Sequence, residues 1–210
     1  MRYTVEMTEP RASLRAEQVA QTRAELVHAG RQLFGANGFA GTSVEDIARL
    51  ARVTTGALYH HFPTKAAVFE AVFEQLHAEL MAASGAAAAR AQGAVEQLTA
   101  AFTAYLDKVL EPEVRRIIVT DAPAVLGLER FTELDERYAF AAVVAALKAA
   151  NDSGTLHVAD PDTLARLLLG ALTRAGLLIA SSADPRATRD AVSATLRAII
   201  GGFGPGSGGS

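Results

Sequence analysis

The chain has 210 residues, of which half are apolar and a fifth are charged, and its formal net charge is −3 at pH 7. This length allows one domain or two small ones with a sizeable core. Because the chain contains no cysteine, a disulfide framework, a cysteine-ligated zinc site and a thiol nucleophile are excluded. Ala, Leu and Val supply most of the apolar residues, which favours helices over strands.

The charges are unevenly distributed along the chain. Through Lys65 there are 8 Lys or Arg and 6 Asp or Glu, whereas the rest of the chain has 12 and 17. The acidic excess therefore lies in the C-terminal part. The small cationic excess before it permits nucleic-acid binding without indicating it.

No targeting or membrane segment is expected. Residues 1–10 lack the basic start and apolar run of a signal peptide, so we expect a cytoplasmic protein. The most apolar segment, 164–180, contains Arg166 and Arg174, and each would cost about 3 kcal/mol at the centre of a bilayer. This segment is predicted to be a buried helix, with no membrane as a partner.

The first predicted helix begins at Arg15. Apolar residues from Val19 to Phe34 recur at spacings of three and four, and the segment Gly35–Gly38 ends the pattern. Residues 1–14 show no such periodicity, and residues 203–210 are rich in Gly and Ser, so both are predicted to be flexible termini.

Two short helices are predicted next. Thr42–Glu45 has the form of a capping box, with the Thr42 hydroxyl as the cap, and apolar residues from Val44 to Ala51 cover about two turns. After a break at 52–56, Leu58 and Phe62 mark another short helix, which Pro63 ends. Two short helices with a short break between them are typical of a helix-turn-helix.

The rest of the chain is predicted to be helical as well. Thr64 can cap a helix that buries residues from Val68 to Leu80, and further helical patterns cover 94–110, 112–119, 129–150, 160–182 and 185–200. No strand-like alternation is long enough to support a sheet. We therefore predict an all-α fold, with a three-helix helix-turn-helix domain at 15–65 and a helical C-terminal domain at 66–202.

Residues 20–75 resemble the N-terminal domain of the tetracycline-repressor (TetR) family. The most specific part is the run Gly56-x-Leu58-Tyr59-x-His61-Phe62-x-x-Lys65, preceded by Thr42 and by Ile47-Ala48. The resemblance implies a homodimeric regulator that binds a palindromic operator in double-stranded DNA. It also implies a C-terminal domain for ligand sensing and dimerisation. Two positions depart from the family pattern, because Arg52 stands where Gly is usual and Pro63 where a polar residue is common.

The residue types of this segment suit contacts with DNA. Hydroxyls at a helix N-terminus favour a phosphate, and Tyr, His and Lys side chains can donate to phosphate oxygens. Small residues at the start of the second short helix let its backbone approach base edges. The predicted DNA-binding residues are Thr42, Ser43, Thr54, Thr55, Gly56, Ala57, Tyr59, His60, His61 and Lys65. Each of these residues could instead have a structural role or none. It could cap a helix, pack in the core or lie in solvent without a contact.

The C-terminal part offers a dimer interface and a ligand pocket. In the family the last two long helices dimerise, and the corresponding apolar residues here are Leu164, Leu168, Leu172, Ala175, Ile179, Val192, Leu196 and Ile199. Those helices could instead complete the core of a monomer. The predicted pocket residues, which ordinary core packing would also explain, are Phe102, Tyr105, Leu106, Val109, Ile118, Asp121, Leu126, Phe131 and Tyr138.

The sequence suggests one function and leaves two alternatives to it. The first is a repressor released from its operator by a small apolar effector whose identity is unknown. The second is an enzyme, but the sequence has no HExxH, GxSxG, phosphate-loop or Rossmann glycine pattern, and its histidines lack metal-ligand spacing. We therefore expect no catalytic activity, no metal and no cofactor. The third is a DNA-binding regulator whose C-terminal domain binds a protein partner or no ligand.

Overall fold

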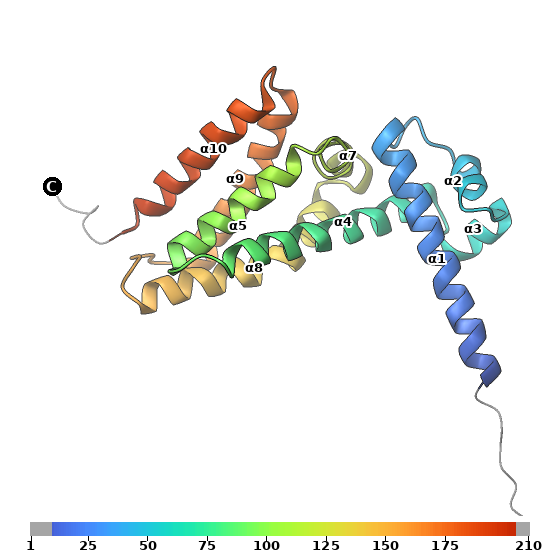
Figure 1. Cartoon of the computed structure of the whole chain (residues 1–210), viewed down its shortest axis with the longest axis horizontal. Coiled ribbons are helices and arrows are strands. Elements are labelled where there is room, and N and C mark those ends of the chain that lie inside the picture. The colour runs from blue at the N-terminus through green and yellow to red at the C-terminus, as the bar shows by residue number, and fades with distance from the viewer. Residues whose placement is uncertain (1–9, 205–210) are drawn as a thin grey trace, which may run out of the picture. The chain divides into compact units, whose positions relative to one another are not determined.

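The computed structural model describes residues 10–204, and in that range the chain is helical with no strand (Figure 1). The predicted all-α fold is confirmed. The elements are α1 Pro10–Asn37, α2 Val44–Leu50, α3 Thr55–His61, α4 Lys65–Ala88, α5 Ala94–Val109, α6 Pro112–Val114, the π-helical segment η1 Arg115–Asp121, α7 Ala122–Leu126, α8 Leu128–Asp152, α9 Pro161–Ser181 and α10 Pro185–Gly201.

The chain divides into two compact units, residues 1–72 and residues 73–210. The boundary lies within α4, so the first residues of this helix belong to one unit and the rest to the other. The sequence instead predicts the domain boundary after residue 65, where α4 begins.

Both predicted flexible termini need correction where the structure describes them. α1 begins at Pro10, not at Arg15. Proline is tolerated in the first turn of a helix, because a backbone N–H there has no acceptor within the helix. Pro10 therefore does not exclude a helix. At the other end, the Phe203 carbonyl accepts a hydrogen bond from the His157 N–H at 2.7 Å, which ties residue 203 to the second unit. Residues 1–9 and 205–210 of the predicted termini lie outside the described residues.

Aromatic side chains form the core of the first unit. The ring centroid of Phe34 lies 5.8 Å from that of Phe39 and 5.2 Å from that of Phe69, and the Phe39 and Phe69 centroids are 5.4 Å apart. Phe69 comes from α4 and is fully buried, and so is Leu58 of α3. These contacts join α1, the loop before α2 and the start of α4 in one closely packed core.

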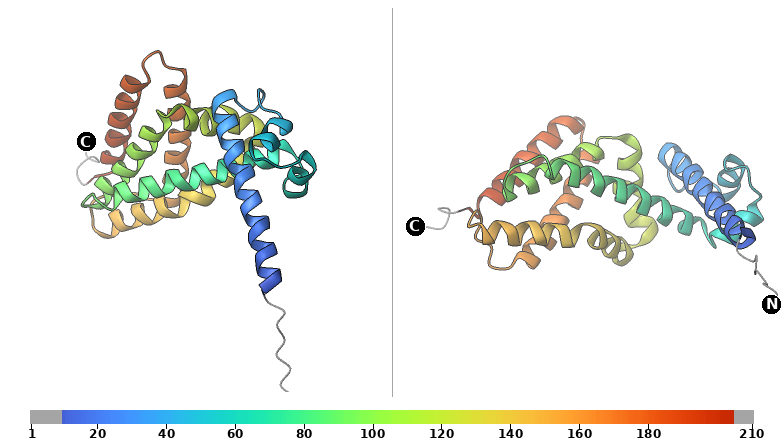
Figure 2. Two further views of the ribbon diagram at one scale, coloured as in Figure 1. Left: turned by 45° about the vertical axis from the view of Figure 1, so that its right-hand side comes forward. Right: turned by 60° about the horizontal axis from the view of Figure 1, so that its bottom comes forward.

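In the second unit, α5 contacts α8, α9 and α10, and α9 and α10 form a helical hairpin (Figure 2). The predicted helix at 112–119 is interrupted, because the chain passes from α6 into η1 and then α7. In η1 the Thr120 hydroxyl donates to the Arg115 carbonyl at 3.2 Å. A π-helical turn shifts the register of the following residues, which the regular spacing of three and four does not reveal.

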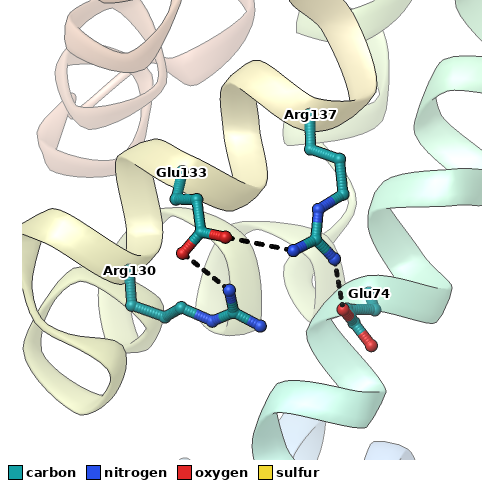
Figure 3. A network of polar contacts seen from close by, with 4 residues as sticks. All are labelled: Glu74, Arg130, Glu133 and Arg137. Carbon is teal, nitrogen blue, oxygen red and sulfur yellow. Dashed lines mark hydrogen bonds and ion pairs between the residues drawn. The ribbon is translucent and has the colours of Figure 1, made fainter.

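An exposed charge network links α4 and α8 within the second unit (Figure 3). The Arg137 guanidinium lies 3.5 Å from the Glu74 carboxylate and 3.1 Å from that of Glu133, and Arg130 donates to Glu133 at 2.7 Å. The Arg130 bond is the main cause that holds the pKa of the Glu133 carboxyl below its ordinary value. Because all four side chains are at least partly exposed, the network contributes little to stability.

α9 is long and apolar enough to cross a membrane by length and composition alone. However, Leu164, Leu168 and Ile179 are buried against other helices of the same unit. A core helix of a soluble protein passes the same test of length and composition. One face of α9 is therefore buried as in a core helix, but Leu167, Leu177 and Leu178 are exposed, so the helix is less fully buried in the single chain than the sequence predicts.

Candidate functional site

A helix-turn-helix is formed by α2 and α3. The Val53 N–H donates to the Ala48 carbonyl at 2.9 Å, and the Arg52 N–H donates to Arg49 at 3.1 Å, so the end of α2 folds tightly into the turn. Arg52 has φ 58°, in the left-handed region. This conformation costs a residue with a side chain about 1 kcal/mol more than glycine, which explains why glycine is usual there in the family that the sequence resembles.

The start of α2 differs from the sequence prediction. The N-cap is Ser43, whose hydroxyl oxygen accepts from the Asp46 N–H at 3.1 Å. Thr42 is 2% exposed, and its hydroxyl donates to the Gly38 carbonyl at 2.9 Å. The predicted cap was therefore wrong by one residue, because Ser and Thr are both good caps and tertiary packing buries one of them. A buried hydroxyl that already donates to a carbonyl is poorly placed to meet a phosphate.

The Ser43 hydroxyl is also engaged, because it donates to the Asp46 carboxylate at 2.6 Å. This bond is the largest cause of a pKa for Asp46 below the ordinary value, and an ion pair with Arg49 adds to it. A carboxylate in the first turn repels a nearby phosphate unless Arg49 balances it. A phosphate at this end of α2 would thus rely on backbone N–H groups more than on hydroxyls.

α3 has one buried and one exposed face. Leu58 and Phe62 are 0% and 2% exposed, and they hold the helix against the core of the first unit. Gly56, Tyr59 and His60 are exposed on the other side, where Tyr59 keeps 51% of its surface accessible. The spacing of three and four between residues 56, 59 and 60 places them on one face. This face is a candidate surface for the major groove of DNA.

The other predicted residues of α3 surround that face. Thr54 is the N-cap, and its hydroxyl oxygen accepts from the Ala57 N–H at 3.1 Å. Thr55, Ala57 and His61 are half-buried, and the His61 ring lies 5.6 Å from that of His60. Thr54 therefore orients α3, while Thr55 stands at the edge of its exposed face.

Lys65 holds the first unit together from the start of α4. Its ammonium donates to the carbonyls of Phe39 and Thr42, both at 2.8 Å, and lies 4.2 Å from the centroid of the Phe39 ring. Two of its three N–H donors are thus used inside the protein. These bonds favour a role for Lys65 in positioning the segment before α2 over the predicted phosphate contact.

One contact near α3 was missed at the sequence level. The Arg23 guanidinium of α1 lies 4.2 Å from the centroid of the Phe62 ring, at the end of α3. A cation over an aromatic face is attracted to it electrostatically. The two residues are far apart in the sequence, so no local sequence pattern indicates that they are in contact.

A cavity of about 200 Å³ lies within the second unit, between α4, α5, α8 and α9. Phe102, Tyr105 and Tyr138 line it, as predicted from the sequence. The other predicted residues do not line it: Leu106, Val109 and Ile118 are buried in the surrounding core, Phe131 packs against Phe73, and Asp121 and Leu126 lie at the ends of η1 and α7. The lining residues that the sequence did not predict include Met81, Ser84 and Gly85, which lie in α4 beyond the predicted buried stretch from Val68 to Leu80.

The predicted dimer face of α9 needs a correction. Six of its residues are 0% to 9% exposed in the single chain: Leu164, Leu168, Leu172, Ala175, Ile179 and, on α10, Leu196. These side chains pack mainly inside the second unit, so they offer little surface to a second copy. Because α9 is apolar on more than one side, periodicity alone could not decide which side faces inward.

Other residues of α9 and α10 are accessible. Leu167 and Leu178 of α9 are 66% and 42% exposed, and Ile199 of α10 is 45% exposed. Val192 is half-buried, and it lines a groove between the two helices together with Leu178 and Ile199. Of the eight predicted interface residues, Val192 and Ile199 are the most accessible, and Ala175 and Leu196 also line this groove.

Among residues 10–204, no group of three or more His, Asp or Glu side chains could hold a metal ion.

Sequence profiles of known families match both parts of the chain. Residues 26–72 match the profile for bacterial regulatory proteins of the tetR family, and residues 95–203 match that for the tetracyclin repressor-like C-terminal domain. The second match alone covers just over half of the chain.

Curated relatives agree with these matches. The HTH-type transcriptional regulator TtgR of Pseudomonas putida is 43% identical over 61 residues, which are 29% of this chain and 29% of TtgR. The match therefore spans less than a third of the length of TtgR. The Transposon Tn10 TetC protein of Escherichia coli is 26% identical over 156 residues, or 73% of this chain and 78% of TetC.

Solved structures resemble the whole chain. A TetR-family transcriptional regulator from Pectobacterium atrosepticum is 34% identical, covers 90% of this chain and 96% of its own, and has a TM-score of 0.80. RolR in complex with the ligand resorcinol has a TM-score of 0.68 at 20% identity, over 89% of this chain and 90% of its own, which shows a shared fold.

The fold and the exposed face of α3 define a helical DNA-binding regulator of transcription. The chain belongs to the TetR family of transcriptional regulators, as its resemblance in sequence implies.

Proposed function

We propose that this protein is a transcriptional repressor that binds a palindromic operator as a homodimer in the cytoplasm and leaves the DNA when a small apolar ligand binds its second unit. The observation that carries the proposal is the division of α3 into a buried face at Leu58 and Phe62 and an exposed face at Gly56, Tyr59 and His60. A helix held in this way presents fixed side chains to a major groove.

The residues of the first unit take different roles in this proposal. Tyr59 and His61 contact phosphates, while Thr55 and His60 meet base edges and Gly56 and Ala57 let the backbone come close. Ser43 and Thr54 cap α2 and α3, with backbone N–H groups left for phosphates. Thr42 and Lys65 fix the segment before α2, since Lys65 binds the Thr42 carbonyl.

The experiment is selection of bound sites from random duplex DNA, followed by affinity measurements on the selected palindrome. Tyr59→Phe should weaken binding about tenfold, because it removes one hydrogen bond to a charged oxygen. Tyr138→Phe, which alters a tyrosine of the second unit's cavity, is the matched control and should leave affinity unchanged. Equal affinity for random and selected duplexes at physiological salt would contradict sequence-specific repression.

The homodimer is proposed to form through the accessible surface of α9 and α10. Leu167→Glu should raise the dimer dissociation constant at least about 100-fold, because a buried unpaired charge is costly. Leu128→Glu is the matched control, since Leu128 is 77% exposed at the start of α8. Light scattering that shows the wild-type protein as a monomer at micromolar concentration would exclude this arrangement.

Release by a ligand is supported by the cavity in the second unit. Its α4 wall belongs to the helix whose first residues pack in the first unit, so a ligand that shifts α4 can change how α3 is presented. The two affinities must then be coupled reciprocally. The alternative is a second unit that binds a protein partner or nothing, in which case no ligand changes operator affinity.

A further inference from the structure

Small side chains create the cavity of the second unit. Its walls carry Ala101 of α5 and Ala139, Ala142 and Ala146 of α8, beside the larger rings of Phe102, Tyr105 and Tyr138. The rings keep the helices apart, while the alanines between them leave space unfilled. Protein interiors are otherwise close-packed, so a hollow of about 200 Å³, open to solvent beside Gly85, Gln97 and Ala142, is a specific feature of this unit.

The lining of this cavity contains no charged side chain. Its residues are apolar except for Ser84, Gln97, Thr173 and the two tyrosines, and no Asp, Glu, Lys, Arg or His is among them. A charged ligand would leave water without any group to balance its charge, which is strongly unfavourable. The cavity therefore selects against anions and cations.

One polar atom in the wall has no bonding partner. The Ser84 hydroxyl is buried in α4 and makes no hydrogen bond, and the residue is 8% exposed. Thr173, in contrast, donates to the Leu169 carbonyl at 3.2 Å, and the Gln97 amide donates to the Ala91 carbonyl at 3.3 Å. Because buried polar groups nearly always have a partner, the Ser84 hydroxyl marks a place where a ligand can supply one.

The volume limits the size of the ligand. A cavity of about 150 Å³ holds benzene, so the space here, about 200 Å³, suits one ring with one or two small substituents. Aromatic side chains on two walls favour a flat apolar body.

We propose that this cavity binds an uncharged, single-ring molecule that carries a hydroxyl group and uses it to bond Ser84. This inference rests on the proposed ligand response, because it names the chemical class of the effector for the same site.

The first test is calorimetry on the protein without DNA at pH 7, with toluene, p-cresol and benzoate as probes. p-Cresol stays uncharged at this pH because it is the tyrosine side chain, whose pKa is about 10. It should bind about three- to tenfold more tightly than toluene, since it adds one hydrogen bond, and benzoate should not bind measurably. Benzoate binding as tightly as p-cresol, or no binding of either uncharged ring, would overturn the proposal.

Two variants locate the binding. Ser84→Ala should remove the advantage of p-cresol over toluene and leave toluene affinity unchanged. Ser193→Ala is the matched control, because Ser193 is also buried with an unbonded hydroxyl but lies on α10, outside this cavity. If Ser84→Ala kept the full advantage of p-cresol, Ser84 would not be the contact and the proposal would fail.

Ala139→Leu fills the cavity from its α8 wall and should abolish binding of both rings. Ala145→Leu, on the exposed side of α8, should change neither affinity. Thermal melting of each variant without ligand checks that it folds, and Ser84→Ala stays decisive if Ala139→Leu does not. Operator binding is measured separately, so a protein that binds p-cresol but no operator contradicts the proposed repressor alone, and the reverse result contradicts this inference alone.

Discussion

Two glycines of α4 and its neighbour α1, one in each unit, have opposite effects on packing. A Cβ atom added at Gly30 in α1 would lie 2.9 Å from Val68 Cγ1 and 3.3 Å from Val72 Cγ2, so the absent side chain lets α1 and the start of α4 touch. A Cβ atom added at Gly85, near the other end of α4, would meet nothing within 4 Å. At Gly30 the small residue lets two helices pack closely, whereas at Gly85, on the wall of the cavity, it leaves space unfilled.

This difference fits the separate tasks of the two units. A surface that reads a major groove requires side chains at fixed positions, and a core without voids holds them there. A unit that admits a small molecule requires space that its own side chains leave unfilled. Four predictions test the contrast, in order of decreasing effect.

The largest effect is expected for a deleted aromatic ring. Phe69→Ala removes the ring between Phe34 and Phe39 and should lower the free energy of unfolding by about 4 to 5 kcal/mol. Phe102→Ala should cost only about 3 kcal/mol, because one side of Phe102 already faces the cavity and has fewer contacts to lose. Urea unfolding measures both, and equal costs would show that the two cores are packed alike.

A pH effect is expected from His77 in the second unit. This side chain is 1% exposed beside the rings of Phe73 and Tyr138, and burial lowers its pKa to about 4 from an ordinary 6.5. Below pH 6.5 the unfolded chain binds a proton at His77 that the folded protein does not bind, so the contribution of His77 lowers stability between pH 6.5 and pH 4 and is constant below that range. The total loss is about 3 kcal/mol. Urea unfolding of His77→Phe should lack this loss, and a variant with the wild-type pH dependence would assign it to other groups.

The two glycines provide a matched pair of substitutions. Gly30→Ala should destabilise the protein by about 1 to 2 kcal/mol, because the clash with Val68 and Val72 outweighs the better helix propensity of alanine. Gly85→Ala should stabilise it by about 0.5 kcal/mol, since only the propensity changes. Chemical denaturation gives both values. The same sign for the two substitutions would remove the contrast between the units.

The smallest effect is expected at the turn between α2 and α3. Arg52→Gly relieves a left-handed backbone, at φ 58°, by about 1 kcal/mol, and the greater freedom of glycine in the unfolded chain offsets part of this. A net gain of a few tenths of a kcal/mol is expected, with operator affinity unchanged if Arg52 makes no phosphate contact. If Arg52→Gly lowered operator affinity, and lowered it more at low salt than at high salt, Arg52 would make a phosphate contact.

Local patterns predicted most of the first unit correctly. The break at 52–56 and the stop at Pro63 correctly separate α2 from α3 and end α3, although α3 begins at Thr55, inside the predicted break. These signals depend on neighbours along the chain, such as the cap that Thr54 provides for α3. What they missed depends on distant residues, since the burial of Thr42 and the bonds from Lys65 to residues 39 and 42 follow from how α4 packs.

The second unit shows the limit of periodicity more clearly. The repeat of Leu164, Leu168, Leu172 and Ala175 predicts a helix with a buried face, and the structure has one. The same repeat cannot tell a face buried in its own chain from a face kept for a partner, because both are apolar. The cavity was also only partly anticipated, since Ser84 and Gly85 lie in an Ala-rich stretch with no distinctive pattern.

The sequence by itself determined the helices, the helix-turn-helix and the family, because caps, turn residues and apolar spacing act over a few residues. Only the tertiary structure decided which hydroxyl caps α2, which face of α9 is accessible and where the second unit is hollow. These features arise from contacts between helices far apart in the chain, whose register and separation depend on every side chain packed between them.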